Sequence, residues 1–143
     1  MLRKRKKLIY VAGILTSGGK NSRLKQFYYM IKAIKSGIKL MNEGYDVFIP
    51  HLSVLIDIVS RKKFGYDQWI ELNQNILGRF DGIYLLKNWQ QSSGSAEEYF
   101  ISKYLELEIL FENKYDYFVE ENIGWDKLIK VPKYFNDRKK GNF

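Results

Sequence analysis

The sequence predicts a single α/β domain in which a parallel sheet of about four to five strands is flanked by helices. Three observations support this fold class. Residues 8–12, Leu-Ile-Tyr-Val-Ala, are apolar along their whole length, which is typical of a central strand covered on both faces. Short apolar runs then alternate with segments of helical periodicity. Finally, 143 residues that are 45% hydrophobic suit one core.

The first helix is predicted between Ser22, a favourable N-cap, and Glu43-Gly44, a typical helix end. Its apolar side chains recur every three or four residues and form one stripe along the helix. We expect this stripe to pack into the core. Its members are Leu24, Phe27, Tyr28, Ile31, Ile34, Ile38 and Met41.

The next elements are a strand and two helices. The strand is predicted over residues 45–49, and Pro50 stops it. Residues 52–60 are apolar enough for a short helix, and a longer one is predicted over residues 67–79. Asn73 falls on the apolar face of the longer helix. A buried amide needs a partner, so Asn73 either binds a ligand or bonds to a loop backbone.

The third strand is predicted over residues 82–86, and a polar loop that begins at Trp89 follows it. The loop leads into a helix predicted from Ser95 to Leu105. A fourth strand is predicted over residues 108–111. This alternation favours a doubly wound sheet with right-handed crossovers.

The domain organisation follows from these elements. Residues 1–7 form a basic N-terminal segment, and the α/β domain covers residues 8–130. Within it, residues 112–130 are interpreted as helix. Residues 131–143 are a basic C-terminal tail.

The composition excludes several kinds of site. The chain has no cysteine, which excludes disulfides and thiolate metal sites, and its one histidine cannot form a multi-histidine site. We therefore expect neither a metal nor a cofactor. The net charge is +8, and the excess lies largely near the two ends. This pattern fits a nucleic-acid footprint or a solvated surface, and we favour the solvated surface.

We expect a cytoplasmic protein without a membrane partner, because no apolar stretch is long enough to cross a bilayer. The basic run before residues 8–15 superficially resembles a signal peptide, but these residues fit better as the opening strand. Nucleic acid is the least favoured partner, because aromatic residues do not interleave with the terminal basic runs.

Two polar loops are predicted at the carboxyl edge of the sheet, where doubly wound domains bind ligands. Glycines in the first loop allow close approach to a phosphate, although an ordinary flexible turn is an equal interpretation. The second loop leads into a helix N-terminus, which favours anions. The candidate binding residues are Gly13, Ser17, Gly18 and Gly19 in the first loop, and Ser92, Ser93, Gly94 and Ser95 in the second.

A set of short segments also carries a family resemblance. They are Ile9-Tyr10-Val11-Ala12-Gly13, Val47-Phe48-Ile49-Pro50, Trp69, Asp81-Gly82-Ile83-Tyr84-Leu85-Leu86, Trp89 and Ser92-Ser93-Gly94-Ser95-Ala96-Glu97-Glu98. In this order and spacing they resemble the nucleoside 2-deoxyribosyltransferase superfamily, especially its small, phage-borne or uncharacterised members. The resemblance covers about residues 8–111 and implies a flavodoxin-like fold.

The resemblance implies cleavage of the N-glycosidic bond of a 2′-deoxynucleoside or its 5′-monophosphate by a glutamate nucleophile. That glutamate lies four residues after the loop glycine, Gly94, and is therefore Glu98. Tyr10 matches the strand tyrosine that hydrogen-bonds near the nucleophile or the sugar. The position that usually holds an acid facing the base is here Asn73.

The chain departs from the family pattern at Asn73 and at Ser92, where transferases carry acids. Serines in this loop are more similar to the monophosphate-binding members, in which they hold the 5′-phosphate. On a helical wheel the apolar stripe centres nearer Glu97, so Glu97 is the reserve candidate for the nucleophile. Asp81 completes the catalytic candidates, with a cap or turn role as its alternative.

The sequence thus favours an enzyme without a cofactor, an N-glycosidase or deoxyribosyltransferase that acts through Glu98 on a small deoxynucleoside or nucleotide. The alternative is a catalytically weak protein that binds a nucleotide or a nucleotide-derived signal on the same fold. The resemblance also implies a homo-oligomer, a dimer or larger.

Overall fold

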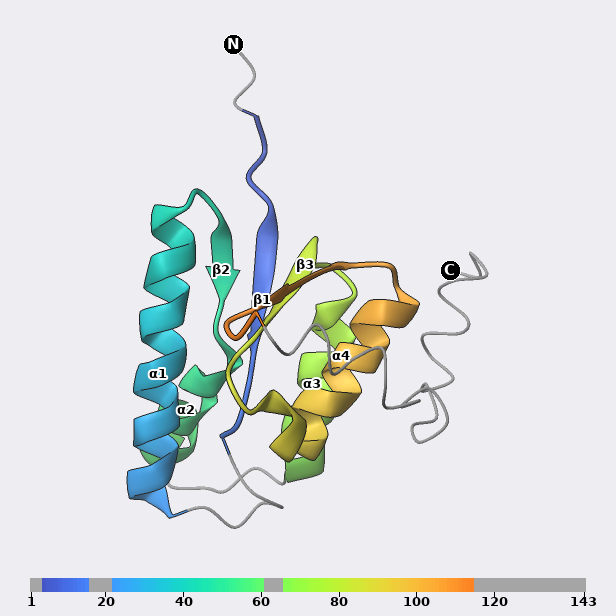
Figure 1. The fold of residues 1–143 in the computed structure, drawn as a ribbon. Helices are drawn as coiled ribbons and strands as arrows, with labels where there is room; N and C mark the ends of the chain where they lie inside the picture. Colours follow the sequence, from blue (N-terminus) through green and yellow to red (C-terminus); the bar gives the residue numbers. More distant parts are fainter. Residues whose placement is uncertain (1–3, 16–21, 61–65, 115–143) are drawn as a thin grey trace.

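The computed structural model of the protein describes residues 4–15, 22–60 and 66–114. Within these ranges, strands and helices alternate along the chain (Figure 1). The predicted tail over residues 131–143 and most of the helix predicted over 112–130 lie outside them. The elements are β1 (Leu8–Ala12), α1 (Arg23–Asn42), β2 (Asp46–Phe48), the 3₁₀ turn η1 (Pro50–Leu52), α2 (Ser53–Ser60), α3 (Tyr66–Leu77), β3 (Gly82–Leu85), the 3₁₀ turn η2 (Trp89–Gln91), α4 (Ser93–Tyr104) and β4 (Glu108–Phe111).

The four strands form one parallel sheet in the order β2-β1-β3-β4. The register aligns Tyr10 of β1 with Phe48 of β2 and Ile83 of β3. The predicted α/β fold class is therefore confirmed, with β1 in the interior of the sheet. Parallel pairing of neighbours needs crossover connections, and helices supply them between the strands.

Helices cover both faces of the sheet (Figure 1). Alternate residues of β1 point to opposite faces, as the two-residue period of a strand requires. Tyr10 and Ala12 belong to the core cluster beneath α3 and α4, together with Leu77 and Ile101. Ile9, Val11, Tyr84 and Leu86 instead form a second cluster with Ala33 and Leu40 of α1. The two clusters place Tyr10 on the α4 side of the sheet.

The predicted orientation of α1 is wrong. Most of its apolar stripe faces solvent, and Leu24 is 81% exposed. The helix instead buries Gln26, Met30, Ala33, Gly37 and Leu40. Small residues on this inner face let the helix approach the sheet closely, because a Cβ atom at Gly37 would lie only 2.6 Å from Ile49 Cδ1. Close packing against β2 therefore selects a face that hydrophobicity alone does not identify.

No helix within the described ranges combines the length and apolar character needed to span a bilayer.

Candidate functional site

A buried pair of side chains joins the central strand to α4. The hydroxyl of Tyr10, on β1, donates a hydrogen bond of 2.6 Å to Glu98 Oε1, on α4. Tyr10 has no solvent exposure, and Glu98 is only 5% exposed. The two residues lie 88 positions apart, so the pair forms only when α4 packs on the sheet. The sequence had assigned both to one catalytic group, and the fold brings them together.

Local structure around α4 fixes the position of Glu98. Ser92 is the N-cap, and its side-chain oxygen accepts a hydrogen bond of 3.3 Å from the backbone N–H of Ser95. One turn beyond Glu98, the Ser102 hydroxyl donates a 2.7 Å hydrogen bond to the Glu98 carbonyl oxygen. Nearly every residue from Gly94 to Ser102 is buried. The glutamate is therefore held on a rigid, packed helix.

Burial dominates the electrostatics of the pair. It raises the pKa of Glu98 from 4.5 to about 8, because desolvation disfavours the charged carboxylate. The Tyr10 hydrogen bond acts in the opposite direction, and the nearby charge of Glu97 adds to the increase. Burial likewise raises the pKa of Tyr10 well above its usual value. At neutral pH the carboxyl of Glu98 is thus largely protonated. The hydrogen bond from Tyr10 favours the ionised carboxylate of Glu98.

Aromatic rings adjoin the Tyr10 side chain. Phe80 meets it edge to face, with ring centroids 5.5 Å apart, and Phe48 lies 5.9 Å away. Phe48 is also 38% exposed, so this aromatic group extends from the buried pair to the surface. Rings in such a position exclude water and present flat faces to a ligand. Neither Phe48 nor Phe80 is among the site residues predicted from the sequence, although the alternation along β2 would have placed Phe48 on the same face as Tyr10.

The neighbouring acid, Glu97, has a different environment. Its Oε2 accepts a 2.8 Å hydrogen bond from Gln74 Nε2 of α3, and its side chain is only half-buried. Gln74 of α3 therefore contacts an acid of α4. Asn73 is half-buried on the same helix. Glu98 is the buried acid that contacts the tyrosine, so it remains the first candidate and Glu97 the reserve.

The residues of the predicted phosphate loop belong to α4 instead, because Ser92 is its N-cap and Ser93, Gly94 and Ser95 form its first turn. Ser92, Gly94 and Ser95 are buried, and Ser93 is exposed. Since the Ser92 oxygen caps the helix, the positive end of the helix dipole is the feature of this loop best suited to an anion. Gly94 lies four residues before Glu98, which is about 6 Å along the helix axis.

The comparisons with known proteins place this arrangement in a family. Residues 7–111 match the family described as "Domain of unknown function (DUF4406)". The chain belongs to the DUF4406 family. The matched range spans β1 to β4 and includes both Tyr10 and Glu98. No curated protein matches the sequence.

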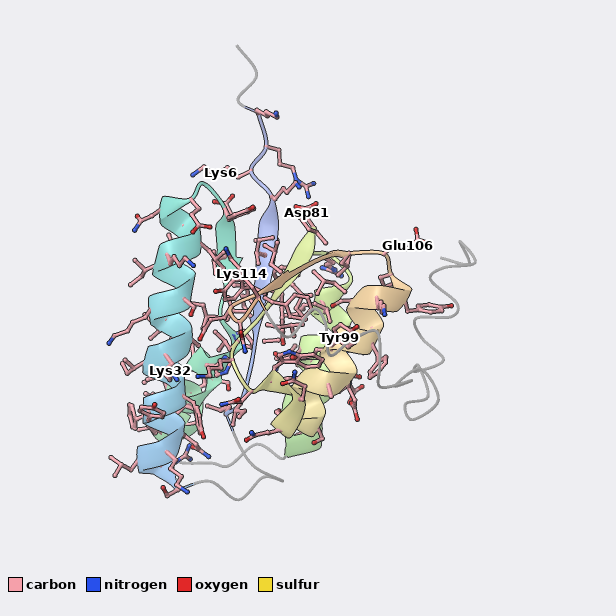
Figure 2. The ribbon with its side chains drawn as sticks, viewed as in Figure 1. Lys6, Lys32, Asp81, Tyr99, Glu106 and Lys114 are labelled. Carbon is pink, nitrogen blue, oxygen red and sulfur yellow. The ribbon has the colours of Figure 1, made fainter. Side chains whose placement is uncertain are left out.

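Asp81 of the DUF4406 domain lies apart from the pair. Figure 2 shows it at the end of the sheet where the N-terminal segment joins β1. Its carboxylate accepts hydrogen bonds from the Arg5 guanidinium, at 2.8 and 2.9 Å, and from the Leu8 N–H, at 2.8 Å. The Leu8 N–H and Arg5 also lower the pKa of Asp81. We therefore withdraw Asp81 from the catalytic candidates and assign it to the anchoring of the N-terminal segment.

The loop after β1 is only partly described in the DUF4406 domain. Ser17, Gly18 and Gly19 lie outside the described residues. Gly13 is buried, and a Cβ atom there would lie 2.5 Å from Leu86 Cδ1, so close packing already explains this glycine. His51 is buried beside the backbone of Gly13 and Ile14, and burial lowers its pKa to about 4. His51 is therefore neutral at physiological pH.

Within the described ranges of the DUF4406 domain, no group of three or more histidine or acidic side chains is placed to hold a metal ion.

Proposed function

We propose that the protein cleaves the N-glycosidic bond of a 2′-deoxynucleoside or its 5′-monophosphate, with Glu98 as the nucleophile. The observation that carries this proposal is the buried 2.6 Å hydrogen bond between Tyr10 and Glu98. It joins the two residues that the resemblance to nucleoside 2-deoxyribosyltransferases selects independently. We further propose that the DUF4406 fold of this chain is a member of that superfamily.

The chemistry needs a carboxylate on the face of the sugar opposite the base. Glu98 attacks C1′ as the C1′–N bond breaks, and the bonding electrons leave with the base, which takes up a proton from solvent. Water then adds its oxygen to C1′, loses a proton and releases Glu98 as a carboxylate. In deoxyribosyl transfer, a ring nitrogen of a second base takes the place of water.

Each neighbour of Glu98 has a role in this proposal. The Tyr10 hydroxyl stabilises the ionised glutamate, which is the reactive form. The aromatic group of Phe48 and Phe80 limits access of water, and the N-terminus of α4 attracts a 5′-phosphate. Binding of the phosphate would orient C1′ toward the carboxylate, which is a major source of rate. We propose a small deoxynucleoside or nucleotide as the ligand. We also propose that the protein works in the cytoplasm as a homo-oligomer.

Base release measured by liquid chromatography tests the proposal. The substrates are a panel of deoxynucleosides and their 5′-monophosphates. Glu98→Gln should reduce release by on the order of 10³-fold or more, because it removes the nucleophile but preserves shape. Glu106→Gln is the matched control, since this exposed glutamate lies beyond the end of α4 (Figure 2). Equal activity of Glu98→Gln and the wild type would sink the assignment, and loss confined to Glu97→Gln would transfer it to Glu97.

One observation favours a second function, nucleotide binding without efficient catalysis. A Glu98 side chain with a pKa of about 8 is mostly uncharged at neutral pH, and an uncharged carboxylic acid is a poor nucleophile. Calorimetry with deoxynucleoside monophosphates distinguishes the two functions. Binding without base release from any member of the panel would support the binding protein.

A further inference from the structure

The outer face of α1 is apolar and open to solvent. Leu24 is 81% exposed, Tyr28 58% and Ile38 53%. Phe27, Ile31 and Met41 are also exposed, at 38–58%, and we call these six side chains the outer stripe. The inner face already packs on the sheet through Ala33 and Leu40. A helix with one apolar face buried and a second one exposed has a surface suited to a partner.

The spacing of the outer stripe indicates what kind of partner fits. Leu24, Ile31 and Ile38 are separated by seven residues each, and so are Phe27, the half-buried Ile34 and Met41. Apolar residues at this pair of seven-residue repeats form the seam along which one helix packs against another. The partner of α1 is therefore expected to be a helix with a matching repeat, and a second copy of α1 has that repeat.

A neighbouring helix enlarges the surface. α2 packs against α1 (Figure 1), and its sequence Ser-Val-Leu-Ile-Asp-Ile-Val-Ser is apolar on most sides. Val54 is buried, whereas Leu55, Ile56, Ile58 and Val59 are exposed. Helices that are apolar all round are normally buried. The outer stripe and these four side chains thus give two helices in contact exposed apolar residues.

The charges of α1 determine how a second copy can meet it. The helix α1 contains no acidic residue, and Lys25, Lys32 and Lys39 form a row beside the outer stripe. Lys32 borders the stripe directly, because its Nζ lies 5.4 Å from the centroid of the Tyr28 ring. If two copies meet along the stripe, these lysines stay at the solvated rim of the contact, where their mutual repulsion is screened by salt.

We propose that two copies of this chain associate through the outer stripe of α1 and the exposed face of α2. A contact that uses the same surface on both copies closes by two-fold symmetry and leaves no open end. A second copy supplies the matching helix repeat, and the same interface covers the exposed side chains of α2. This inference does not depend on the glycosidic reaction, because none of the stripe residues contacts the Tyr10–Glu98 pair.

Sedimentation velocity and light scattering measure the association. The wild type should be a dimer, and Ile31→Glu and Ile38→Glu should each raise its dissociation constant by at least ~30-fold, because each buries a charge in the seam. Lys25→Glu is the matched control, since it places the same charged side chain on the same helix beside the stripe. A monomeric wild type, or dimers that persist in both isoleucine variants, would overturn the proposal.

A second measurement applies even if the glutamate variants fail to fold. The chain has no cysteine, so single substitutions report contacts cleanly. At least one of Leu24→Cys, Ile31→Cys and Ile38→Cys should form a covalent dimer with a short bifunctional thiol reagent, whereas Glu106→Cys should not. Cross-linking at Glu106 alone would place the contact elsewhere and reject the stripe.

The sign of the salt dependence separates a second copy from an acidic lipid surface. Added salt screens the lysine rows, so it should leave the dimer unchanged or strengthen it. Binding of the same lysines to phosphatidylserine vesicles would weaken as salt is added. A wild type that stays monomeric and sediments with such vesicles only at low salt would assign the stripe to lipid and refute the dimer.

Discussion

At the scale of the residue, Glu98 is governed by competing effects of burial and hydrogen bonding. Removal from water disfavours its charge, whereas the Tyr10 hydroxyl, at 2.6 Å, favours it. Burial prevails, and the pKa of Glu98 rises to about 8. A carboxyl with this pKa changes its charge within the range in which most enzymes are assayed.

This balance predicts the pH dependence of base release. The rate should rise with pH and level off above about 8, since the carboxylate is the reactive form. Tyr10→Phe removes the hydrogen bond that lowers the pKa of Glu98, so it should shift the midpoint to higher pH. It should also reduce the rate at pH 7 by roughly 10–100-fold, the effect of losing one charge-assisted hydrogen bond. Tyr45→Phe is the control, and an unchanged midpoint in Tyr10→Phe would contradict the assigned role.

The same pKa predicts how stability depends on pH. Between pH 4.5 and about 8 the folded protein keeps the Glu98 proton that the unfolded chain releases. The contribution of this proton to the free energy of unfolding is therefore fully present below pH 4.5 and is lost as pH rises through 8. Glu98→Gln cannot titrate. In urea titrations, the wild type should lose stability relative to Glu98→Gln by about 1.4 kcal/mol for each pH unit between pH 4.5 and about 8. Parallel curves for the two proteins would show that Glu98 titrates normally.

At the scale of the element, two glycines that lie close to neighbouring side chains have different tolerances. A Cβ atom at Gly13 would meet Leu86 Cβ at 2.7 Å, next to the Leu86 backbone, which cannot move cheaply. At Gly37, within α1, the nearest atom is Ile49 Cδ1 at 2.6 Å, the end of a flexible side chain. Leu86 therefore cannot make room for a side chain at position 13, whereas Ile49 can change its rotamer to make room at position 37.

A pair of substitutions follows from this difference. Gly13→Ala should lower the free energy of unfolding by about 1–3 kcal/mol, the usual cost of overpacking. Gly37→Ala should be close to neutral, because the better helix propensity of alanine, worth about 1 kcal/mol, offsets the shift of Ile49. Thermal unfolding of both variants measures the two effects. A larger loss for Gly37→Ala than for Gly13→Ala would mean that α1 cannot adjust over β2.

The bounds of the elements could be predicted from the sequence, but the faces that they bury could not. Strands and helices were predicted within a few residues of their observed bounds, because their periodicities differ clearly. The face of α1 was predicted wrongly, since this helix has two apolar faces and Ala33 and Gly37 give no strong hydrophobic signal. On α4 the wheel favoured Glu97, but the helix is buried on nearly all sides, so a wheel cannot distinguish the two acids. Gln74 and Phe80 contact the site only through tertiary packing, which the sequence pattern does not contain.

At the scale of the whole molecule, association should couple to stability. If copies associate through the outer stripe, the folded dimer is favoured by mass action, so the melting temperature should rise with protein concentration. Ile38→Glu should remove this dependence and leave the melting temperature of the monomer unchanged within a few degrees. Differential scanning calorimetry over a wide concentration range tests this. A concentration-independent wild type would argue against dimeric unfolding.

The N-terminal segment also stabilises the molecule as a whole. The ion pairs Arg5–Asp81, at 2.8 Å, and Lys7–Glu108, at 2.7 Å, connect this segment to the starts of β3 and β4. Both pairs are exposed, so each contributes little stability on its own. They also neutralise two of the basic charges near the N-terminus.

The interior position of β1 has a consequence for synthesis on the ribosome. This apolar strand is translated first, yet its partner β3 is complete only when residue 85 has been made. Until then only β2, of the two neighbours of β1, can pair with it, so the other edge of this apolar strand stays open in the nascent chain. The adjacent run Lys4-Arg5-Lys6-Lys7 supplies the repelling charges that flank such strands as gatekeepers. We therefore expect Arg5 and Lys7, which pair with Asp81 and Glu108 in the folded protein, to oppose aggregation of this open edge until β3 is made.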